Sequence, residues 1–227
     1  MIAALFDLDG TLYTGHIWQD LVRHHWTARR HRRWAAAYVV RNMAPLPLYR
    51  LGLMSKATYF HTWGETMSWL LRGWSLDEAQ ALFEELTEEQ IVPNVRPDIL
   101  YRLHQHRDQG HLVALVSGTF APLLAVIADR LGVPHAIGTP LQVSDRRYTG
   151  RIEPPLCQSE GKPKRVQSYL ADRDVEIDWT ASYAYADRDT DISLLSLVGQ
   201  PVVVYPDEIL LAHAQAEGWP IIGGPES

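Results

Sequence analysis

The spacing of hydrophobic and polar positions changes along the chain, and each spacing predicts a different kind of structure. Residues 2–6 form an apolar run that ends in acidic residues and a glycine, which predicts a buried strand followed by a loop. From about residue 14 to about residue 92, apolar residues recur at helical spacing. One face of a predicted helix begins at Trp18 and continues with the residues three, four, seven and eight positions later, which are Leu21, Val22, His25 and Trp26.

Two more helices are predicted in this stretch, at 57–71 and 76–86. Ser75 stands just before the second of them and Glu78 follows three residues later, which is the capping-box pattern of a helix N-terminus. The prolines Pro93 and Pro97 lie so close together that they interrupt the helical region.

Beyond these prolines, short apolar runs alternate with helical patterns. The predicted strands are 112–116, 136–137, 141–143, 148–152, 183–186 and 202–205, and the predicted helices are 99–109, 120–131, 164–171, 192–198 and one at the end of the chain. Strands that alternate with helices indicate a parallel sheet covered by helices. We therefore predict an α/β fold, with a Rossmann-like core at 1–13 and 93–227 and an inserted all-helical cap at 14–92.

Composition places the chain among ordinary globular proteins and narrows its partners. Of its 227 residues, 46% are hydrophobic and 21% are charged. The net charge of -6 provides no basic field for nucleic acid. Cys157 is the single cysteine, so an internal disulfide is excluded, and no Cys/His group has zinc-site spacing. The chain has no signal-peptide pattern and no apolar stretch of about 18 residues, so we expect a cytoplasmic protein without a membrane span.

The segment Asp7-Leu8-Asp9-Gly10-Thr11 places two carboxylates at the end of the first predicted strand. One carboxylate of such a pair can bind a cation and attack, while the other exchanges protons. Gly10 would allow a sharp turn of the backbone. A solvated turn that uses Asp and Gly for conformational reasons is the alternative interpretation.

Two further segments offer groups that bind anions. Ser117-Gly118-Thr119 follows the strand 112–116, and a hydroxyl with free N–H groups at a helix start can hold a phosphate; the alternative is a simple helix cap. Lys162 could neutralise a phosphate, although most lysines are solvated surface residues. The surrounding sequence is not a P-loop, because Leu156 and Pro163 occupy positions that need Gly and Ser or Thr.

A second acidic segment, from Asp187 to Asp191, follows the strand 183–186. Carboxylate oxygens at a strand end suit a hard cation such as Mg²⁺, whereas acids that complement a helix dipole are the alternative. Ligands of open parallel sheets bind at the carboxyl ends of the strands, so we expect these segments to converge.

In this order, the segments resemble the motifs of the haloacid dehalogenase superfamily. The matching residues are Asp7-Leu8-Asp9-Gly10-Thr11 for the first motif, Ser117 for the second, Lys162 for the third, and Asp187 with Asp191 for the fourth. A helical insertion between the first two motifs resembles the C1-type cap of this family. The sequence around Ser117 and Asp187 resembles the branch that contains phosphoserine phosphatase.

The resemblance implies a magnesium-dependent phosphatase that acts on a small organic phosphate ester. It implies that Asp7 is the nucleophile that forms an aspartyl phosphate, that Asp9 is the general acid and base, and that Mg²⁺ binds Asp7, Asp187 and the carbonyl of Asp9. Dehalogenases and phosphonatases of the family lack an Asp at position 9, and its ion pumps need membrane spans.

The remaining motif residues have supporting roles in this comparison. Ser117 and the Gly118 N–H would hold the transferring oxygens, Lys162 would neutralise their charge, and Asp191 and Thr11 would support the site. A phosphotransferase or mutase of the same family, and a non-catalytic module on the same fold, are the alternatives.

The predicted cap raises the question of the substrate. Phosphoserine phosphatases carry a Glu shortly after the first motif, whereas His16 stands nine residues after Asp7 here, which argues against phosphoserine. The first half of the cap is strongly basic, through Arg23, Arg29, Arg30, Arg32, Arg33, Arg41, Arg50 and Lys56. Six tryptophans also fall in the cap, namely Trp18, Trp26, Trp34, Trp63, Trp69 and Trp74. They could line a pocket for an apolar leaving group, but the core of the cap itself is the simpler interpretation.

Overall fold

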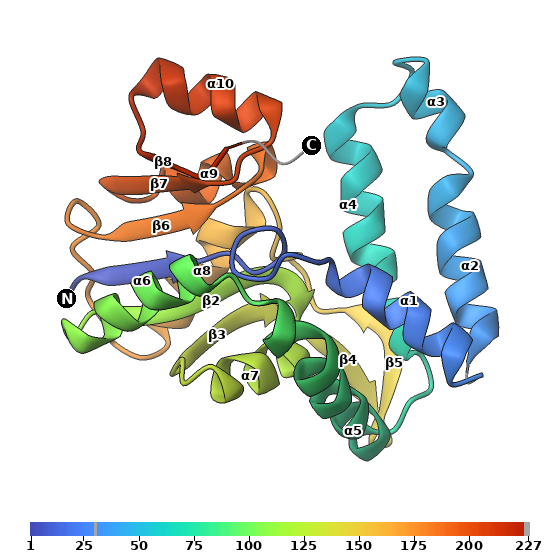
Figure 1. Ribbon diagram of the computed structural model, residues 1–227. Helices are drawn as coiled ribbons and strands as arrows, with labels where there is room; N and C mark the ends of the chain where they lie inside the picture. Colours follow the sequence, from blue (N-terminus) through green and yellow to red (C-terminus); the bar gives the residue numbers. More distant parts are fainter. Residues whose placement is uncertain (30, 225–227) are drawn as a thin grey trace.

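A six-stranded parallel sheet forms the centre of the protein, with the strand order β3-β2-β1-β6-β7-β8 (Figure 1). The computed structural model describes residues 1–29 and 31–224, apart from the side chains of residues 56, 57 and 60; Arg30 and the Lys56 side chain of the basic segment therefore lie outside the described residues. The strands are β1 (Ala3–Phe6), β2 (Leu112–Phe120), β3 (His135–Thr139), β6 (Tyr183–Ala186), β7 (Gln200–Val204) and β8 (Ile221–Ile222). The sheet confirms the predicted α/β Rossmann-like fold.

Helices cover both faces of this sheet. Ala4 and Phe6 of β1 join the apolar cluster under α6 (Pro97–Asp108) and α7 (Ala121–Arg130). The alternate residues Ala3 and Leu5 join a second cluster, formed with α8 (Gly161–Ala171), α9 (Ile192–Leu195) and α10 (Glu208–Glu217). Successive side chains of a strand point to opposite faces, which explains why so short a strand is apolar throughout.

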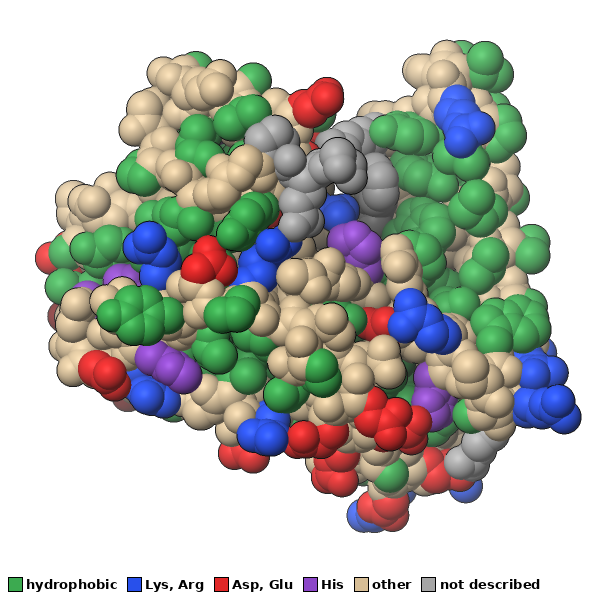
Figure 2. All heavy atoms as spheres, in the orientation of Figure 1, with side chains coloured by type: hydrophobic (Ala, Val, Ile, Leu, Met, Phe, Trp, Pro, Cys, Tyr) green, Lys and Arg blue, Asp and Glu red, His purple; other side chains and the backbone are tan. Residues whose placement is uncertain are grey.

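The segment between β1 and α6 is helical, as predicted. It contains α1 (Ile17–Thr27), α2 (Arg32–Met43), α3 (Leu46–Arg50), α4 (Lys56–Met67) and α5 (Leu76–Leu86), with short turns at Ser68–Leu71, Thr87–Ile91 and Val92–Asn94. Helices α1 to α4 stand beside the sheet as one group, whereas α5 packs against α7 (Figure 1). Figure 2 shows hydrophobic side chains over the cap helices and acidic ones gathered near α5. The limits 14 and 92 of the cap stay a prediction.

Some element boundaries differ from the predicted ones for local physical reasons. Helix α5 has the predicted limits, because both hydrogen bonds of the Ser75–Glu78 capping box form. The hairpin of β4 (Leu141–Ser144) and β5 (Arg147–Ile152) also forms. Strand β2 continues beyond the predicted end at Val116. The pairing with β3 shifts register after Val116, and Phe120 then pairs with Thr139.

The buried face of α1 is displaced from the predicted one. Helix α1 buries Ile17, Asp20, Leu21 and His25, whereas Trp26 is 46% exposed. The apolar pattern did not predict that Asp20 is buried. Its carboxylate accepts a hydrogen bond from the Tyr13 hydroxyl at 2.5 Å, which offsets part of the cost of burying it. Within the part of the chain that the structure describes, no helix is long and apolar enough to cross a membrane.

Candidate active site

The first and fourth motifs meet because β1 and β6 are neighbours in the sheet. Asp7 follows β1 directly and donates its backbone N–H to the Tyr185 carbonyl of β6 at 2.9 Å. Asp187 follows β6, and β2 brings Ser117 to the other side of β1. All three side chains are buried. The predicted convergence at the carboxyl ends of the strands is therefore present.

Lys162 reaches this point from the first turn of α8. Its Nζ lies 2.5 Å from Asp7 Oδ1 and 2.5 Å from Asp191 Oδ1, and the lysine is 4% exposed. Gly161 allows the start of α8 to lie against the preceding loop, because a Cβ at this position would lie 1.8 Å from the Leu156 carbonyl oxygen. Burial by itself lowers the pKa of Lys162, but the carboxylates of Asp191 and Asp7 outweigh burial and raise it.

Three buried carboxylates surround this lysine. Asp7, Asp187 and Asp191 each offer an oxygen, and these oxygens lie within 4.8 Å of one another. Burial and the nearby Asp7 raise the pKa of Asp187 well above its usual value, and burial raises the pKa of Asp191 to about 6 although Lys162 opposes the shift. Lys162 and Arg188, whose Nε lies 3.4 Å from Asp187 Oδ2, supply two positive charges against three buried carboxylates, and oxygen-rich acidic groups suit a hard cation. The donor set therefore fits a divalent metal ion.

Asp9 belongs to the same loop but has a different environment from Asp7. Its Oδ1 accepts a hydrogen bond from the Ile17 backbone N–H at 2.8 Å, which ties the start of α1 to the site. Burial raises the pKa of Asp9 to about 7, the Ile17 amide opposes the rise and the charge of Asp7 adds to it. A carboxyl group with this pKa can both donate and accept a proton near neutral pH.

Gly10 is required by conformation and by space. Its φ of +87° lies in the left-handed region, where a side chain is strained. A Cβ at this position would lie 2.1 Å from Asp187 Oδ2. Asp187 is held in place by the Thr11 hydroxyl, which donates to Asp187 Oδ1 at 2.8 Å. The glycine therefore lets the first motif lie directly against the fourth.

The second motif lies in the strand β2 rather than at a helix start. Ser117 Oγ accepts a hydrogen bond from the Thr119 backbone N–H at 3.1 Å. Among the described residues, the buried Thr119 hydroxyl has no hydrogen-bond partner. A Cβ on Gly118 would meet only ordinary contacts, with the Cys157 carbonyl 3.5 Å away, so Gly118 is not required by space there. Helix α7 begins at Ala121, so its N-terminus does not coincide with Ser117.

A cleft of about 690 Å³ joins these groups to the cap. It brings together Asp7, Asp9, Ser117, Gly118, Lys162, Asp187 and Asp191, and of the predicted site residues only Thr11 does not line it. Sequence reasoning missed Arg188, whose Nε lies 3.4 Å from Asp187 Oδ2 and whose Nη2 lies 3.2 Å from His16 Nε2. It also missed that Tyr38 and Tyr59 line the cleft. Arg188 stands inside the fourth motif, and that position was the available signal.

A model of the family described as haloacid dehalogenase-like hydrolase matches residues 4–196. The chain belongs to the haloacid dehalogenase-like hydrolase family. The match spans every motif from Asp7 to Asp191, so the four converging segments belong to the region that the family shares.

Similar proteins place the chain within the family. It is 31% identical over 154 residues to a histidinol-phosphatase of Neisseria meningitidis, covering 67% of this chain and 69% of the relative. It is 35% identical over 151 residues to the phosphoserine phosphatase SerB1 of Mycobacterium tuberculosis, covering 66% of this chain and 48% of the relative, so it spans only about half of that protein. A protein of unknown function from Bordetella pertussis Tohama I has a similar structure, with a TM-score of 0.81, 31% identity and coverage of 98% and 99%. The chain is a phosphatase of this family, in the phosphoserine phosphatase-like branch.

Proposed function

We propose that the chain hydrolyses phosphate monoesters of small organic alcohols in a magnesium-dependent reaction, through a phosphoryl group carried by Asp7. The observation that supports this most strongly is the contact of Lys162 Nζ with Asp7 and Asp191, at 2.5 Å each, inside a buried group of three carboxylates. An ammonium ion holds one carboxylate oxygen of Asp7 and thereby orients the other for attack.

Asp7 attacks phosphorus and the ester oxygen leaves. The bond between Asp7 and phosphorus forms as the bond between phosphorus and the ester oxygen breaks, and protonated Asp9 gives its proton to that oxygen. Asp9 then takes a proton from the water that hydrolyses the aspartyl phosphate. Its pKa of about 7 suits both steps, because the free energies of the two protonation states are close at neutral pH.

The other polar groups of the cleft hold the phosphoryl oxygens. The Ser117 hydroxyl, the Gly118 N–H and the Lys162 ammonium are the donors, and they stabilise the charge that develops on these oxygens. Asp7, Asp187 and Asp191 would hold Mg²⁺ together with the Asp9 carbonyl, and Thr11 keeps Asp187 in place. When bound, the ion offsets the repulsion between the phosphate and the Asp7 carboxylate and polarises the phosphoryl oxygens.

Two amino-alcohol phosphates are the first substrates to test, because relatives carry the names histidinol-phosphatase and phosphoserine phosphatase. His16 stands where phosphoserine phosphatases carry a Glu, and it lies 3.2 Å from Arg188 Nη2, so no carboxylate is available at this position to pair with the ammonium group of phosphoserine. The cytoplasmic location predicted from the sequence stays a prediction.

Hydrolysis of p-nitrophenyl phosphate tests the proposal. We expect phosphate release that needs Mg²⁺, stops on chelation, and falls by at least about 10³-fold in Asp7→Asn, which keeps the shape of the side chain but is not a nucleophile. Asp129→Asn, an exposed residue of α7, is the matched control and keeps full activity. Full activity of Asp7→Asn would contradict the mechanism. Loss of substrate without release of free phosphate would favour a phosphotransferase.

A further inference from the structure

An aromatic group of the cap lies beside the predicted acid of the site. Trp18, Tyr38, Tyr59 and Trp63 line the same cleft as the catalytic groups, and Met67 completes this wall. The ring centroid of Trp63 is 5.0 Å from that of Trp18, 5.6 Å from that of Tyr38 and 6.1 Å from that of Tyr59. Trp63 is therefore the common contact of the group, which we name the aromatic wall.

The start of α1 fixes the position of the aromatic wall relative to the chemistry. The Ile17 N–H binds Asp9 Oδ1 at 2.8 Å, and Trp18 is the next residue of the helix. Asp9 protonates the leaving oxygen in the proposed reaction, so the leaving group emerges at this helix end. The group attached to that oxygen therefore leaves toward the part of the cleft that Trp18 and Trp63 line.

Helix α4 holds the wall close to the core of the protein. A Cβ on Gly64 would lie 2.6 Å from Leu156 Cδ2 and 2.8 Å from Gln158 Oε1. A glycine inside a helix costs about 1 kcal/mol relative to alanine, and here it permits the close packing of α4 against the segment that precedes Lys162. Trp63 is the residue before Gly64, so the packing of α4 against the core determines where Trp63 lies in the cleft.

The chemistry of the cap side differs from that of the core side. Every carboxylate among the described residues that line the cleft belongs to the core loops, at positions 7, 9, 187, 189, 191 and 207. The described cap residues of the cleft are aromatic or apolar apart from Thr14, His16 and Gly64. The buried indole N–H of Trp63 has no acceptor among the described residues. A leaving group with a flat ring fits this side better than one with a small charged group.

We propose that the aromatic wall is a leaving-group subsite for phosphate esters whose alcohol carries a planar ring, with Trp63 as its central residue. This inference rests on the proposed phosphatase function. Burial of a ring among such side chains is worth on the order of a tenfold to hundredfold preference over an ester without the ring.

Two substrate pairs test this subsite. The ratio of kcat/KM for 2-phenylethyl phosphate to that for ethyl phosphate measures recognition of a neutral ring, and the same ratio for L-histidinol phosphate measures recognition of an imidazole. We expect a ratio of on the order of ten or more for at least one ring ester. If both ring esters are hydrolysed no better than ethyl phosphate, the subsite is refuted while the phosphatase function stands.

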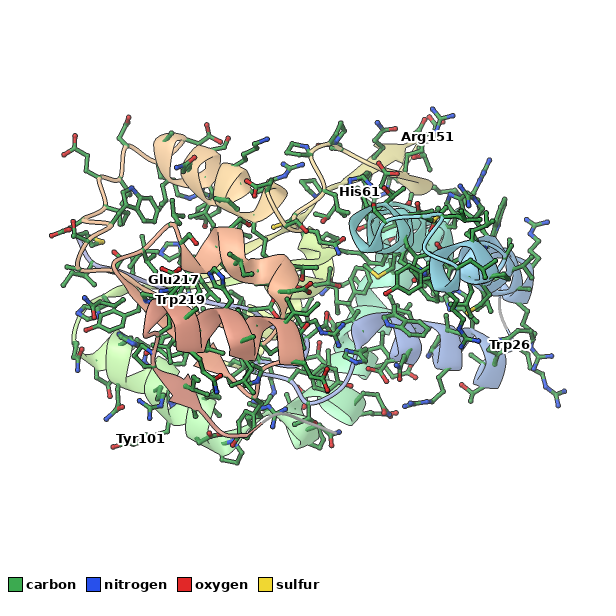
Figure 3. The ribbon with its side chains drawn as sticks, turned by 90° about the horizontal axis from the view of Figure 1, so that it is seen from above. Trp26, His61, Tyr101, Arg151, Glu217 and Trp219 are labelled. Carbon is green, nitrogen blue, oxygen red and sulfur yellow. The ribbon has the colours of Figure 1, made fainter. Side chains whose placement is uncertain are left out.

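Variants of Trp63 separate recognition from folding. Trp63→Leu should lower the ratio of kcat/KM for the ring ester to that for ethyl phosphate about tenfold, mainly through the KM of the ring ester; Trp63→Phe, which keeps a ring, should restore most of the preference. The matched control is Trp26→Leu, because Trp26 is 46% exposed at the far end of α1 and points away from the cleft (Figure 3). If Trp63→Leu slows both esters equally, the residue has only a structural role.

A binding measurement keeps the test independent of catalysis. 2-Phenylethylphosphonate and ethylphosphonate are not hydrolysed, and calorimetry with Mg²⁺ gives their dissociation constants. Tighter binding of the ring compound by wild type, lost in Trp63→Leu, supports the subsite even if no ester is hydrolysed, and that case would refute only the proposed function. Equal binding of the two phosphonates would overturn the subsite.

Discussion

The group of three carboxylates around Lys162 predicts that the metal-free chain is destabilised and that Mg²⁺ raises its melting temperature. The oxygens of Asp7, Asp187 and Asp191 lie within 4.8 Å of one another. Two unit charges at that separation repel by about 3 kcal/mol at an effective dielectric constant of about 20. Lys162 contacts Asp7 and Asp191, whereas the cation beside Asp187 is Arg188, which is 3.4 Å away and 44% exposed and therefore offsets the charge less.

The size of the shift follows from mass action. At 10 mM Mg²⁺, an ion that binds the folded chain with a dissociation constant of about 1 mM adds about 1.4 kcal/mol to the free energy of unfolding. For a chain of this length, 1 kcal/mol corresponds to about 2 to 4 °C, so the melting temperature should rise by about 3 to 6 °C.

Asp187→Asn provides the perturbation. The amide keeps the shape of the side chain but removes one charge, so the metal-free variant should melt at or above the temperature of wild type. Its response to Mg²⁺ should largely disappear, and its activity should be lost. Differential scanning calorimetry with and without chelator measures both quantities, with Asp129→Asn as the control that keeps the wild-type shift. A metal-free Asp187→Asn chain that melts several degrees below wild type, with an unchanged Mg²⁺ shift, would refute the electrostatic reasoning.

Three other changes test the fold and the site. His106 is buried, and burial lowers its pKa to about 4 in the folded chain, whereas the pKa of an exposed histidine is about 6.5. As the pH falls from about 6.5 to about 4, His106 is therefore protonated in the unfolded chain but not in the folded one, and the free energy of unfolding should drop by up to about 3 kcal/mol. Urea titrations across this pH range measure the drop, and His106→Gln should make it smaller. Gly10→Ala should cost about 1 to 3 kcal/mol and abolish activity, because its Cβ would collide with Asp187, and a Gly10→Ala enzyme with wild-type kcat would contradict the contact. Ser75→Ala should cost about 1 kcal/mol in chemical denaturation without changing kcat, since it removes a helix cap that is not part of the cleft lining; an altered kcat would show that α5 acts on the site.

The fold could be predicted from the sequence where a local signal has one interpretation. The apolar run before Asp7 and the Ser75 capping box both depend on neighbours in sequence, and the structure has the strand and the helix at those places. The true length of β2 could not be predicted in this way, because Phe120 becomes part of the strand only through its pairing with Thr139 of another strand. Long-range pairing leaves no mark on the local pattern.

The candidate site shows the same division. The acidic and lysine positions were available from the motifs, since spacing to a strand end determines where such side chains meet. The aromatic wall was not available, because the rotation of each cap helix decides whether a tryptophan faces the core, the cleft or solvent. Trp74 is buried at 2% exposure, Trp63 lines the cleft, and Trp26 is exposed. The sequence left open whether the cap tryptophans form the core of the cap or line a pocket, and the structure shows that Trp74 does the first and Trp63 the second.

Acid-quenched labelling with a substrate that carries a radioactive phosphoryl group tests the central claim most directly. The account predicts a covalent label in the presence of Mg²⁺, located on the peptide that contains Asp7, sensitive to hydroxylamine as an acyl phosphate is, and absent from Asp7→Asn. A label on any other residue, or rapid hydrolysis with no label at any quench time, would contradict it.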